Sequence, residues 1–176
     1  MDTKFRLIEK EYKDFHNSFL ARGMLPMRST DVGFWNASIP SEVFTAFKKL
    51  GLSRYNNFLD IGSGDGSVTL IASLFCRNAH GVEFDRELHN KAVEMQEKLG
   101  INNAVFLNDN YFNMDLSNFD VLFSAPDSPM ARGLENKLLK EMKGHLIIYG
   151  YHFHPSNMKK LKEVKFEGNL ITVYSK

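Results

Sequence analysis

The sequence predicts a three-layer α/β/α sandwich built on a mostly parallel sheet of seven strands that ends in an antiparallel hairpin. Two observations predict this fold. From residue 55 onward, short apolar runs alternate with longer stretches of helical periodicity, which is typical of parallel strands joined by crossover helices. Near the C-terminus, two runs that alternate apolar and polar residues flank Gly168 and Asn169, which is the pattern of a hairpin.

The central segment supplies most of the predicted elements. Strands are expected at residues 57–61, 79–83, 104–108, 119–124 and 144–149, with helices at 67–75, 86–99, 129–142 and 155–161. Gly100 ends the helix over 86–99, because glycine readily adopts the left-handed conformation that closes a helix. The hairpin strands are expected at 163–167 and 170–174.

The first 50 residues precede this alternating pattern. A helix is predicted over 9–20 and another over 41–50, and the segment 22–39 between them has the composition of a loop. We therefore expect residues 1–50 to form a helical extension that packs over the sheet as a lid. The extension belongs to the same unit as the α/β domain over 51–176.

Composition and charge exclude several classes of protein. The chain has 176 residues, of which 43% are hydrophobic and 24% charged, and its formal net charge is +1. These values are typical of one globular domain. No run approaches the roughly 20 apolar residues that a membrane helix needs. Charges interrupt the first residues, unlike a secretory signal, and the single cysteine, Cys76, has no partner for an internal disulfide, so a cytoplasmic protein is expected.

A glycine-rich loop follows the first predicted strand. Asp60 lies near the end of that strand, and glycines occupy positions 62, 64 and 66. Glycine permits a tight turn and lets the backbone approach a ligand closely, and the start of the next helix offers unpaired N–H groups. An acid at the end of a buried strand is expected to meet a cationic or hydrogen-bonding group. The loop is therefore predicted to bind a cofactor.

The spacing Asp60-x-Gly62-x-Gly64-x-Gly66 resembles motif I of the class I S-adenosylmethionine-dependent methyltransferases. The resemblance implies a Rossmann-like fold and S-adenosyl-L-methionine as cofactor. It also implies that this loop, with Ser63 inside it, faces the amino-acid half of the cofactor, which carries an ammonium and a carboxylate but no pyrophosphate.

Two later strand ends carry further candidates for cofactor binding. Glu83 follows the glycine loop by about 20 residues, where an acid can accept hydrogen bonds from both hydroxyls of a ribose. Phe84 beside it can pack on the adenine. Methyltransferases that this chain resembles place a polar residue against the adenine amine after the third strand, and Asp109 or its neighbour Asn110 matches that place. An acid like Glu83 also occurs in NAD-binding folds, so the three strand ends together predict the cofactor.

The fourth predicted strand leads into Ser124-Ala125-Pro126-Asp127. Methyltransferases that act on exocyclic amines of bases or on glutamine amides carry Asn/Asp-Pro-Pro-Tyr at this point. The different tetrapeptide disfavours methylation of the adenine amino group. No cysteine lies near this loop either, which disfavours cysteine-assisted methylation of pyrimidine C5.

From about residue 34 onward the chain also resembles the small archaeal protein-lysine methyltransferases and the mitochondrial enzymes that methylate ATP synthase subunit c. The resemblance rests on Ile-Pro-Ser-Glu-Val at 39–43, the glycine loop at 60–66, Gly-Val-Glu at 81–83 and Leu-Glu-Asn-Lys-Leu-Leu-Lys-Glu at 134–141. It implies methylation of lysine amines in proteins. Residues 33–38 depart from the Val-Pro-rich lead-in of those enzymes.

Methylation of lysine is an in-line transfer from a sulfonium to a neutral amine, so the enzyme must position the amine and keep it deprotonated. Aromatic walls and acceptors can hold the cationic amine before it loses its proton. Tyr111, Ser124 and Asp127 are the expected catalytic residues. Trp35 and Tyr151 are expected to bind the substrate.

Other functions stay open at this point. Residues 131–176 carry nine lysines and arginines against four glutamates, a basic segment that would suit an RNA acceptor. A small-molecule acceptor under the N-terminal lid and a non-catalytic module that only binds S-adenosylmethionine are further alternatives. His152 and His154 have no third ligand nearby in the sequence, so no metal site is expected.

Overall fold

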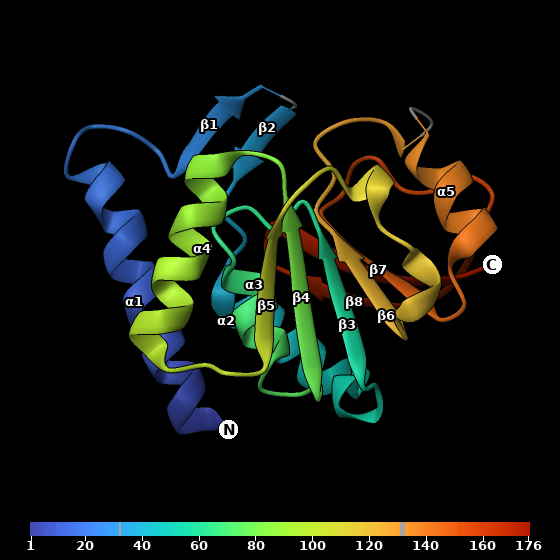
Figure 1. Cartoon of the computed structure of the whole chain (residues 1–176), viewed down its shortest axis with the longest axis horizontal. Helices are drawn as coiled ribbons and strands as arrows, with labels where there is room; N and C mark the ends of the chain where they lie inside the picture. Colours follow the sequence, from blue (N-terminus) through green and yellow to red (C-terminus); the bar gives the residue numbers. More distant parts are fainter. Residues whose placement is uncertain (32, 131–132) are drawn as a thin grey trace.

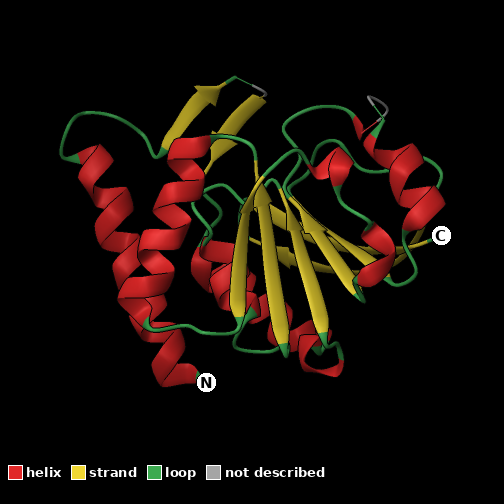
Figure 2. Cartoon of the chain, in the orientation of Figure 1, coloured by secondary structure: helices red, strands yellow, loops and turns green. Residues whose placement is uncertain are grey.

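The structure is a computed structural model that describes residues 1–31, 33–130 and 133–176 (Figures 1 and 2). Its main sheet contains the strands β3 (Asn57–Ile61), β4 (Asn78–Glu83), β5 (Ala104–Asn108), β6 (Val121–Ser124), β7 (His145–Tyr149), β8 (Lys159–Phe166) and β9 (Asn169–Ser175). They lie in the order β5-β4-β3-β6-β7-β9-β8. Strands β3 to β7 are parallel, whereas β9 runs antiparallel to β7 and β8. The predicted seven-stranded α/β fold with its C-terminal hairpin is confirmed.

Helices cover both faces of this sheet (Figure 1). One face packs against α1 (Asp2–Leu20), α2 (Pro40–Leu50), η1 (Leu52–Arg54), α3 (Ser67–Ala72) and α4 (Arg86–Leu99), and the other against η2 (Tyr111–Asn113), η3 (Leu116–Asn118) and α5 (Leu134–Glu141). Successive strand residues point to opposite faces, so Phe58 joins the first core and Leu59 the second. In the described part of the chain, no helix is long and apolar enough to cross a membrane.

Helix α4 has the predicted bounds because local signals mark both of its ends. The side chain of Asp85 accepts hydrogen bonds from the amides of Glu87 and Leu88, which have no partner inside the helix. Gly100 closes the other end in the left-handed conformation, with φ of 60°.

The segment 22–39 differs from the loop that the sequence predicts. It contains a hairpin of β1 (Met27–Thr30) and β2 (Gly33–Asn36), in which Arg28 lies opposite Trp35. An isolated two-stranded hairpin is only marginally stable in water. Contacts with the rest of the domain, described below, stabilise this one, and its short strands carry no such signal in their sequence.

The predicted helix over 155–161 is also wrong. Lys159 begins β8 instead and lies opposite Ser175 of β9. Pairing of Lys159 and Lys160 with β9 overrides the local helical preference at the end of this segment. Helices α3 and α5 are shorter than predicted, and residues 131–132 of the predicted helix 129–142 lie outside the described residues.

Candidate functional site

A cavity of about 330 Å³ opens at the carboxyl ends of the parallel strands. Strands β4 and β5 lie on one side of β3, and β6 and β7 lie on the other, so the chain reverses its direction across the sheet between β5 and β6. Ligands of parallel α/β sheets bind in the crevice that such a reversal leaves at the strand ends.

The cavity brings together residues that the sequence predicted from five separate segments. Those that line it are Trp35, Asp60, Gly62, Ser63, Gly64, Glu83, Phe84, Asp109, Asn110, Tyr111, Ser124 and Asp127. Two predicted residues lie elsewhere. Gly66 packs behind the loop, where an added Cβ would lie 2.6 Å from the Cβ of Ala92 in α4. Tyr151 is half-exposed outside the cavity and donates its hydroxyl to the carbonyl of Asn169.

Most backbone amides of the glycine loop already donate hydrogen bonds within the protein. Five of them donate within the protein: Gly62 and Ser63 to Val82 O, Gly64 to Glu83 Oε2, Gly66 to Ser63 O and Ser67 to Asp65 Oδ1. Free amides were expected at the start of the next helix, and there the first amide, that of Ser67, already has Asp65 Oδ1 as its acceptor. A pyrophosphate needs free donors, whereas a ligand with an ammonium needs acceptors. The loop suits the second kind of ligand.

Glu83 lies at the end of β4 with its carboxylate turned toward the loop. Its Oε2 accepts from the Gly64 amide and its Oε1 from the Asp85 amide, both at 2.8 Å. Burial raises the pKa of Glu83, and these two hydrogen bonds partly offset that rise. Each carboxylate oxygen has two lone pairs, so both oxygens can still accept a hydrogen bond from a hydroxyl. The observed bonds therefore leave room for a ribose.

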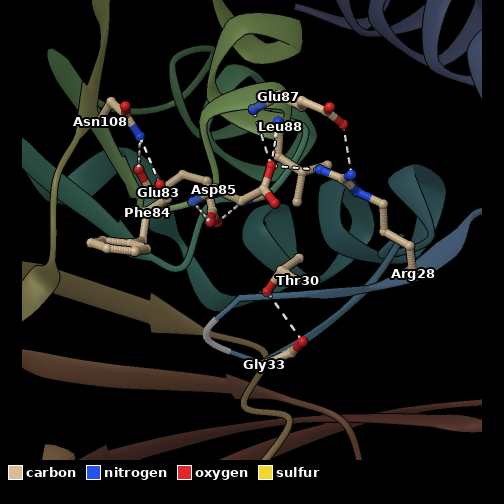
Figure 3. Close-up of polar contacts among 10 residues, drawn as sticks. Arg28, Thr30, Gly33, Glu83, Phe84, Asp85, Glu87, Leu88 and Asn108 are labelled. Atoms are coloured by element: carbon tan, nitrogen blue, oxygen red, sulfur yellow. Dashed lines mark hydrogen bonds and ion pairs between the residues drawn. The ribbon is translucent and has the colours of Figure 1, made fainter.

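Asn108, which the sequence analysis did not select, positions this region. Its Nδ2 donates to the carbonyls of Glu83 and Phe84, each at 2.9 Å, and ties the end of β5 to the end of β4 (Figure 3). Next to it, Asp109 Oδ1 accepts from the Asn110 amide at 2.6 Å. Asn110 in turn caps η2 through the amide of Phe112. These bonds hold the turn that forms the far wall of the cavity.

Asp60 is buried at the floor of the cavity. Thr69 of α3 donates its hydroxyl to Asp60 Oδ2 at 2.9 Å. Burial raises the pKa of Asp60 to about 8, and the charge of Glu83 adds to the rise. A cation at this place would favour the charged carboxylate.

We expect Asp60→Asn to stabilise the ligand-free protein more at pH 8 than at pH 5. The unfolded carboxyl ionises near pH 3.8 and the folded one near pH 8. Between these values the folded state holds the extra proton, so the free energy of unfolding falls as pH rises, by roughly 1.4 kcal/mol per pH unit. Asparagine does not titrate and can still accept from Thr69. Urea unfolding at both pH values measures the effect, and parallel pH dependences of the two proteins would count against a buried acid with a raised pKa.

The β1–β2 hairpin crosses the cavity and is attached at both sides. On one side, Arg28 forms ion pairs with Asp85 Oδ1 at 2.5 Å and Glu87 Oε2 at 2.6 Å, at the start of α4 (Figure 3). On the other side, the amide of Phe34 donates to Asp127 Oδ2 in the loop after β6. Because the two attachments lie on different sides of β3, the hairpin spans the strand ends.

Trp35 of this hairpin is buried against the glycine loop. A Cβ added to Gly64 would lie 2.6 Å from the indole Nε1. The residue lines the cavity, as the predicted role in substrate binding requires, but most of its ring packs on the protein. A glycine at position 64 is thus needed to admit the indole.

The three predicted catalytic residues come from two sides of the cavity: Ser124 ends β6 and Asp127 follows it, whereas Tyr111 begins η2 after β5. Ser124 is buried and donates its hydroxyl to the carbonyl of Ile61 at 3.3 Å. Tyr111 packs its ring on Phe112, with centroids 4.6 Å apart. Burial raises the pKa of Tyr111, and the charge of Asp127 raises it further, so the phenol remains protonated at neutral pH.

His154, near the C-terminus, has structural partners. His154 contacts the Tyr174 hydroxyl through Nδ1 at 2.7 Å and the Gly150 carbonyl through Nε2 at 3.1 Å. Within residues 1–31, 33–130 and 133–176, no three His, Cys, Asp or Glu side chains are grouped so that they could hold a metal ion.

Residues 52–161 match the methyltransferase domain family. The chain belongs to this family. The match and the fold confirm the predicted class I S-adenosylmethionine-dependent methyltransferase, with S-adenosylmethionine as its cofactor. The residues that would hold this cofactor are acceptors and apolar surfaces, as described above, and they fit its ammonium, ribose and adenine.

Solved structures of methyltransferases share this fold. An RNA methyltransferase from Salinibacter ruber in complex with S-adenosyl-L-homocysteine superposes with a TM-score of 0.68 at 19% identity, over 78% of this chain and 92% of that one. The tRNA methyltransferase TrmI from Aquifex aeolicus gives a TM-score of 0.61 at 13% identity, over 80% and 70% of the two chains. No curated protein matches the sequence.

Proposed function

We propose that this methyltransferase acts on lysine amines of proteins. The charge of the cavity carries the proposal. Among its described lining residues are five acidic side chains and neither lysine nor arginine: Asp60, Asp65, Glu83, Asp109 and Asp127. In the ligand-free protein Asp60 holds a proton at neutral pH, because burial raises its pKa to about 8, and a cation beside it favours its charged form. An anionic cleft attracts cationic groups and repels phosphates. A lysine side chain meets both requirements, because it is long, slender and positively charged before it reacts.

The cofactor would occupy the part of the cavity between the glycine loop and β4. Glu83 would accept from the ribose hydroxyls, Asp60 and the loop carbonyls would face the ammonium, and Phe84 with Asp109 would meet the adenine. S-adenosylmethionine supplies a methyl group on a sulfonium, which becomes a thioether when the methyl leaves. The remaining work of the protein is to place the acceptor and to manage its proton.

Asp127, Ser124 and Tyr111 are suited to that work. Asp127 would hold the lysine ammonium at the mouth of the cavity, and Tyr111 and Ser124 would orient it. Only the neutral amine has the lone pair that forms the new N–C bond, so one proton must leave the ammonium first. Asp127 would accept that proton and pass it to water.

We also propose that residues 1–50 form a roof over the site, as the sequence suggested. The ion pairs of Arg28 and the hydrogen bond from Phe34 to Asp127 support this role. Asp127 would then contact both the roof and the acceptor, one through each carboxylate oxygen. Opening of the hairpin at the Asp127 side would admit the substrate.

The test is mass spectrometry of a protein pool treated with enzyme and cofactor. We expect gains of one to three methyl groups on lysines, at a rate that rises toward pH 9 because the free ammonium has a pKa of about 10.4. Asp127→Asn keeps an acceptor for the Phe34 amide but removes the charge. It should lower kcat about 10- to 100-fold with little change in cofactor affinity.

Asp14→Asn serves as the control, since Asp14 is exposed on α1 and pairs with Lys10. It should retain full activity. Methyl groups found only in RNA or in small molecules would overturn the proposed acceptor and leave the methyltransferase assignment intact.

RNA is the second candidate acceptor, because the edge strand β8 contains four exposed lysines that could contact phosphates: Lys159, Lys160, Lys162 and Lys165. Lysines on an edge strand also prevent pairing with other chains, which needs no nucleic acid. RNA binding that weakens steeply with salt, together with methylated RNA, would favour this candidate.

A further inference from the structure

Helix α1 contacts the glycine loop directly, although it lies far from it in the sequence. Tyr12 donates its hydroxyl to the carbonyl of Asp65 at 2.8 Å. One helical turn later, His16 Nε2 lies 2.8 Å from Asp65 Oδ2. These contacts are shielded from water, because Tyr12 is fully buried and the side chains of His16 and Asp65 are only 14% and 3% exposed.

Asp65 connects α1 with the start of α3. It lies between Gly64 and Gly66, and its Oδ1 accepts from the amide of Ser67, where α3 begins. Its Oδ2 contacts His16, and its carbonyl accepts from Tyr12. One residue thus carries three interactions that together fix the position of the loop relative to two helices.

The same contact compensates a buried charge. The carboxylates of Asp65 and Glu83 lie close enough to Asp60 that both raise its pKa. A buried carboxylate without a partner is costly, and repulsion between neighbouring carboxylates adds to that cost. His16 is the side chain that pairs with Asp65.

The outer side of the loop is closed by aromatic rings. The indole of Trp35 packs on Gly64. The ring centroids of His16 and Phe19 lie 6.4 Å and 6.0 Å from the centroid of the Trp35 indole. The inner side is held by the bond from the Gly64 amide to Glu83. The loop is therefore confined between α1 and β4.

We infer that α1, through His16 and Tyr12, positions the glycine loop for S-adenosylmethionine and thereby sets the affinity for the cofactor. A loop with three glycines has many conformations to lose when it orders around a ligand. Ordering it beforehand removes this cost from binding. Both residues lie outside the segment 52–161 that matches the family. The inference concerns the cofactor site and does not depend on the identity of the acceptor.

The test compares His16→Ala, His16→Gln and Ile8→Ala in the full chain. Calorimetry with S-adenosyl-L-homocysteine gives Kd, and thermal unfolding gives Tm without ligand. His16→Ala should weaken binding about tenfold, because it removes the partner of Asp65 Oδ2 and leaves only the Ser67 amide on this buried carboxylate. His16→Gln can donate from an amide nitrogen at a similar distance from the backbone, and it should recover most of the affinity.

Ile8→Ala is the matched control. Ile8 is a buried residue of the same helix that belongs to the core and not to the cavity lining. Its truncation should lower Tm at least as much as His16→Ala but leave Kd unchanged at temperatures well below Tm. Hydrogen exchange of the amides of residues 62–67 in the ligand-free protein should accelerate in His16→Ala and not in Ile8→Ala.

Unchanged Kd in His16→Ala, or equal loss of affinity in His16→Ala and Ile8→Ala, would overturn the inference and leave α1 with a structural role alone. If His16→Ala does not fold, Tyr12→Phe removes only the hydroxyl that binds the Asp65 carbonyl, and a several-fold loss of affinity is expected. If the unaltered protein binds the cofactor but does not methylate lysines, the proposed acceptor is wrong, whereas this inference is unaffected.

Discussion

Gly62→Ala is expected to weaken the binding of S-adenosylmethionine about 100-fold or more while the ligand-free protein stays folded. Gly62 lines the cavity, has φ of 73°, and has no atom within 4 Å of the position of an added Cβ. The methyl group therefore meets no protein atom and enters the space that the cofactor needs. The left-handed backbone adds a strain of about 1 kcal/mol, which a stable domain tolerates.

Gly51→Ala is the control that separates backbone strain from obstruction of the cofactor by the added methyl group. Gly51 ends α2 with φ of 68°, and an added Cβ there also meets nothing within 4 Å, but the residue does not line the cavity. Both variants should lose similar stability in urea, and only Gly62→Ala should lose affinity by calorimetry. Equal affinities of the two variants would show that the cofactor does not approach the loop at Gly62.

Glu83→Ala is expected to weaken cofactor binding about 10- to 100-fold, because ribose hydroxyls that leave water need a partner. It should also destabilise the ligand-free protein, since the amides of Gly64 and Asp85 lose their acceptor. Affinity alone cannot separate these two effects. The separation comes from a second ligand, an analogue of S-adenosyl-L-homocysteine without the ribose hydroxyls.

The unaltered protein should prefer the natural ligand over this analogue, and Glu83→Ala should bind both alike. The coupling between the ligand change and the substitution measures the contact itself. If the preference survives in Glu83→Ala, the carboxylate acts only on the loop. Glu83→Gln should lie between the two proteins, since it keeps one acceptor oxygen.

The cofactor loop and the sheet that carries it could be predicted from the sequence because their signals are local. Asp60 and the three glycines follow an apolar strand within a few residues, and φ is positive at positions 62, 64 and 66, where glycine is needed. Helix α4 is bounded by the cap of Asp85 and by Gly100. Periodicity, caps and turns depend on neighbours along the chain, so a single sequence displays them.

The closed surroundings of the site depend on partners that are distant in the sequence. Arg28 of the β1–β2 hairpin forms ion pairs with Asp85 and Glu87, which lie 57 and 59 positions later in the sequence. The hydrogen bond from Phe34 to Asp127 also holds the hairpin. His16 meets Asp65 across 49 positions. Residues 159–161 form a strand because β9 lies beside them. Short polar segments of this kind have no strong preference of their own, so the folded chain, by bringing their partners into contact, is what specifies their structure.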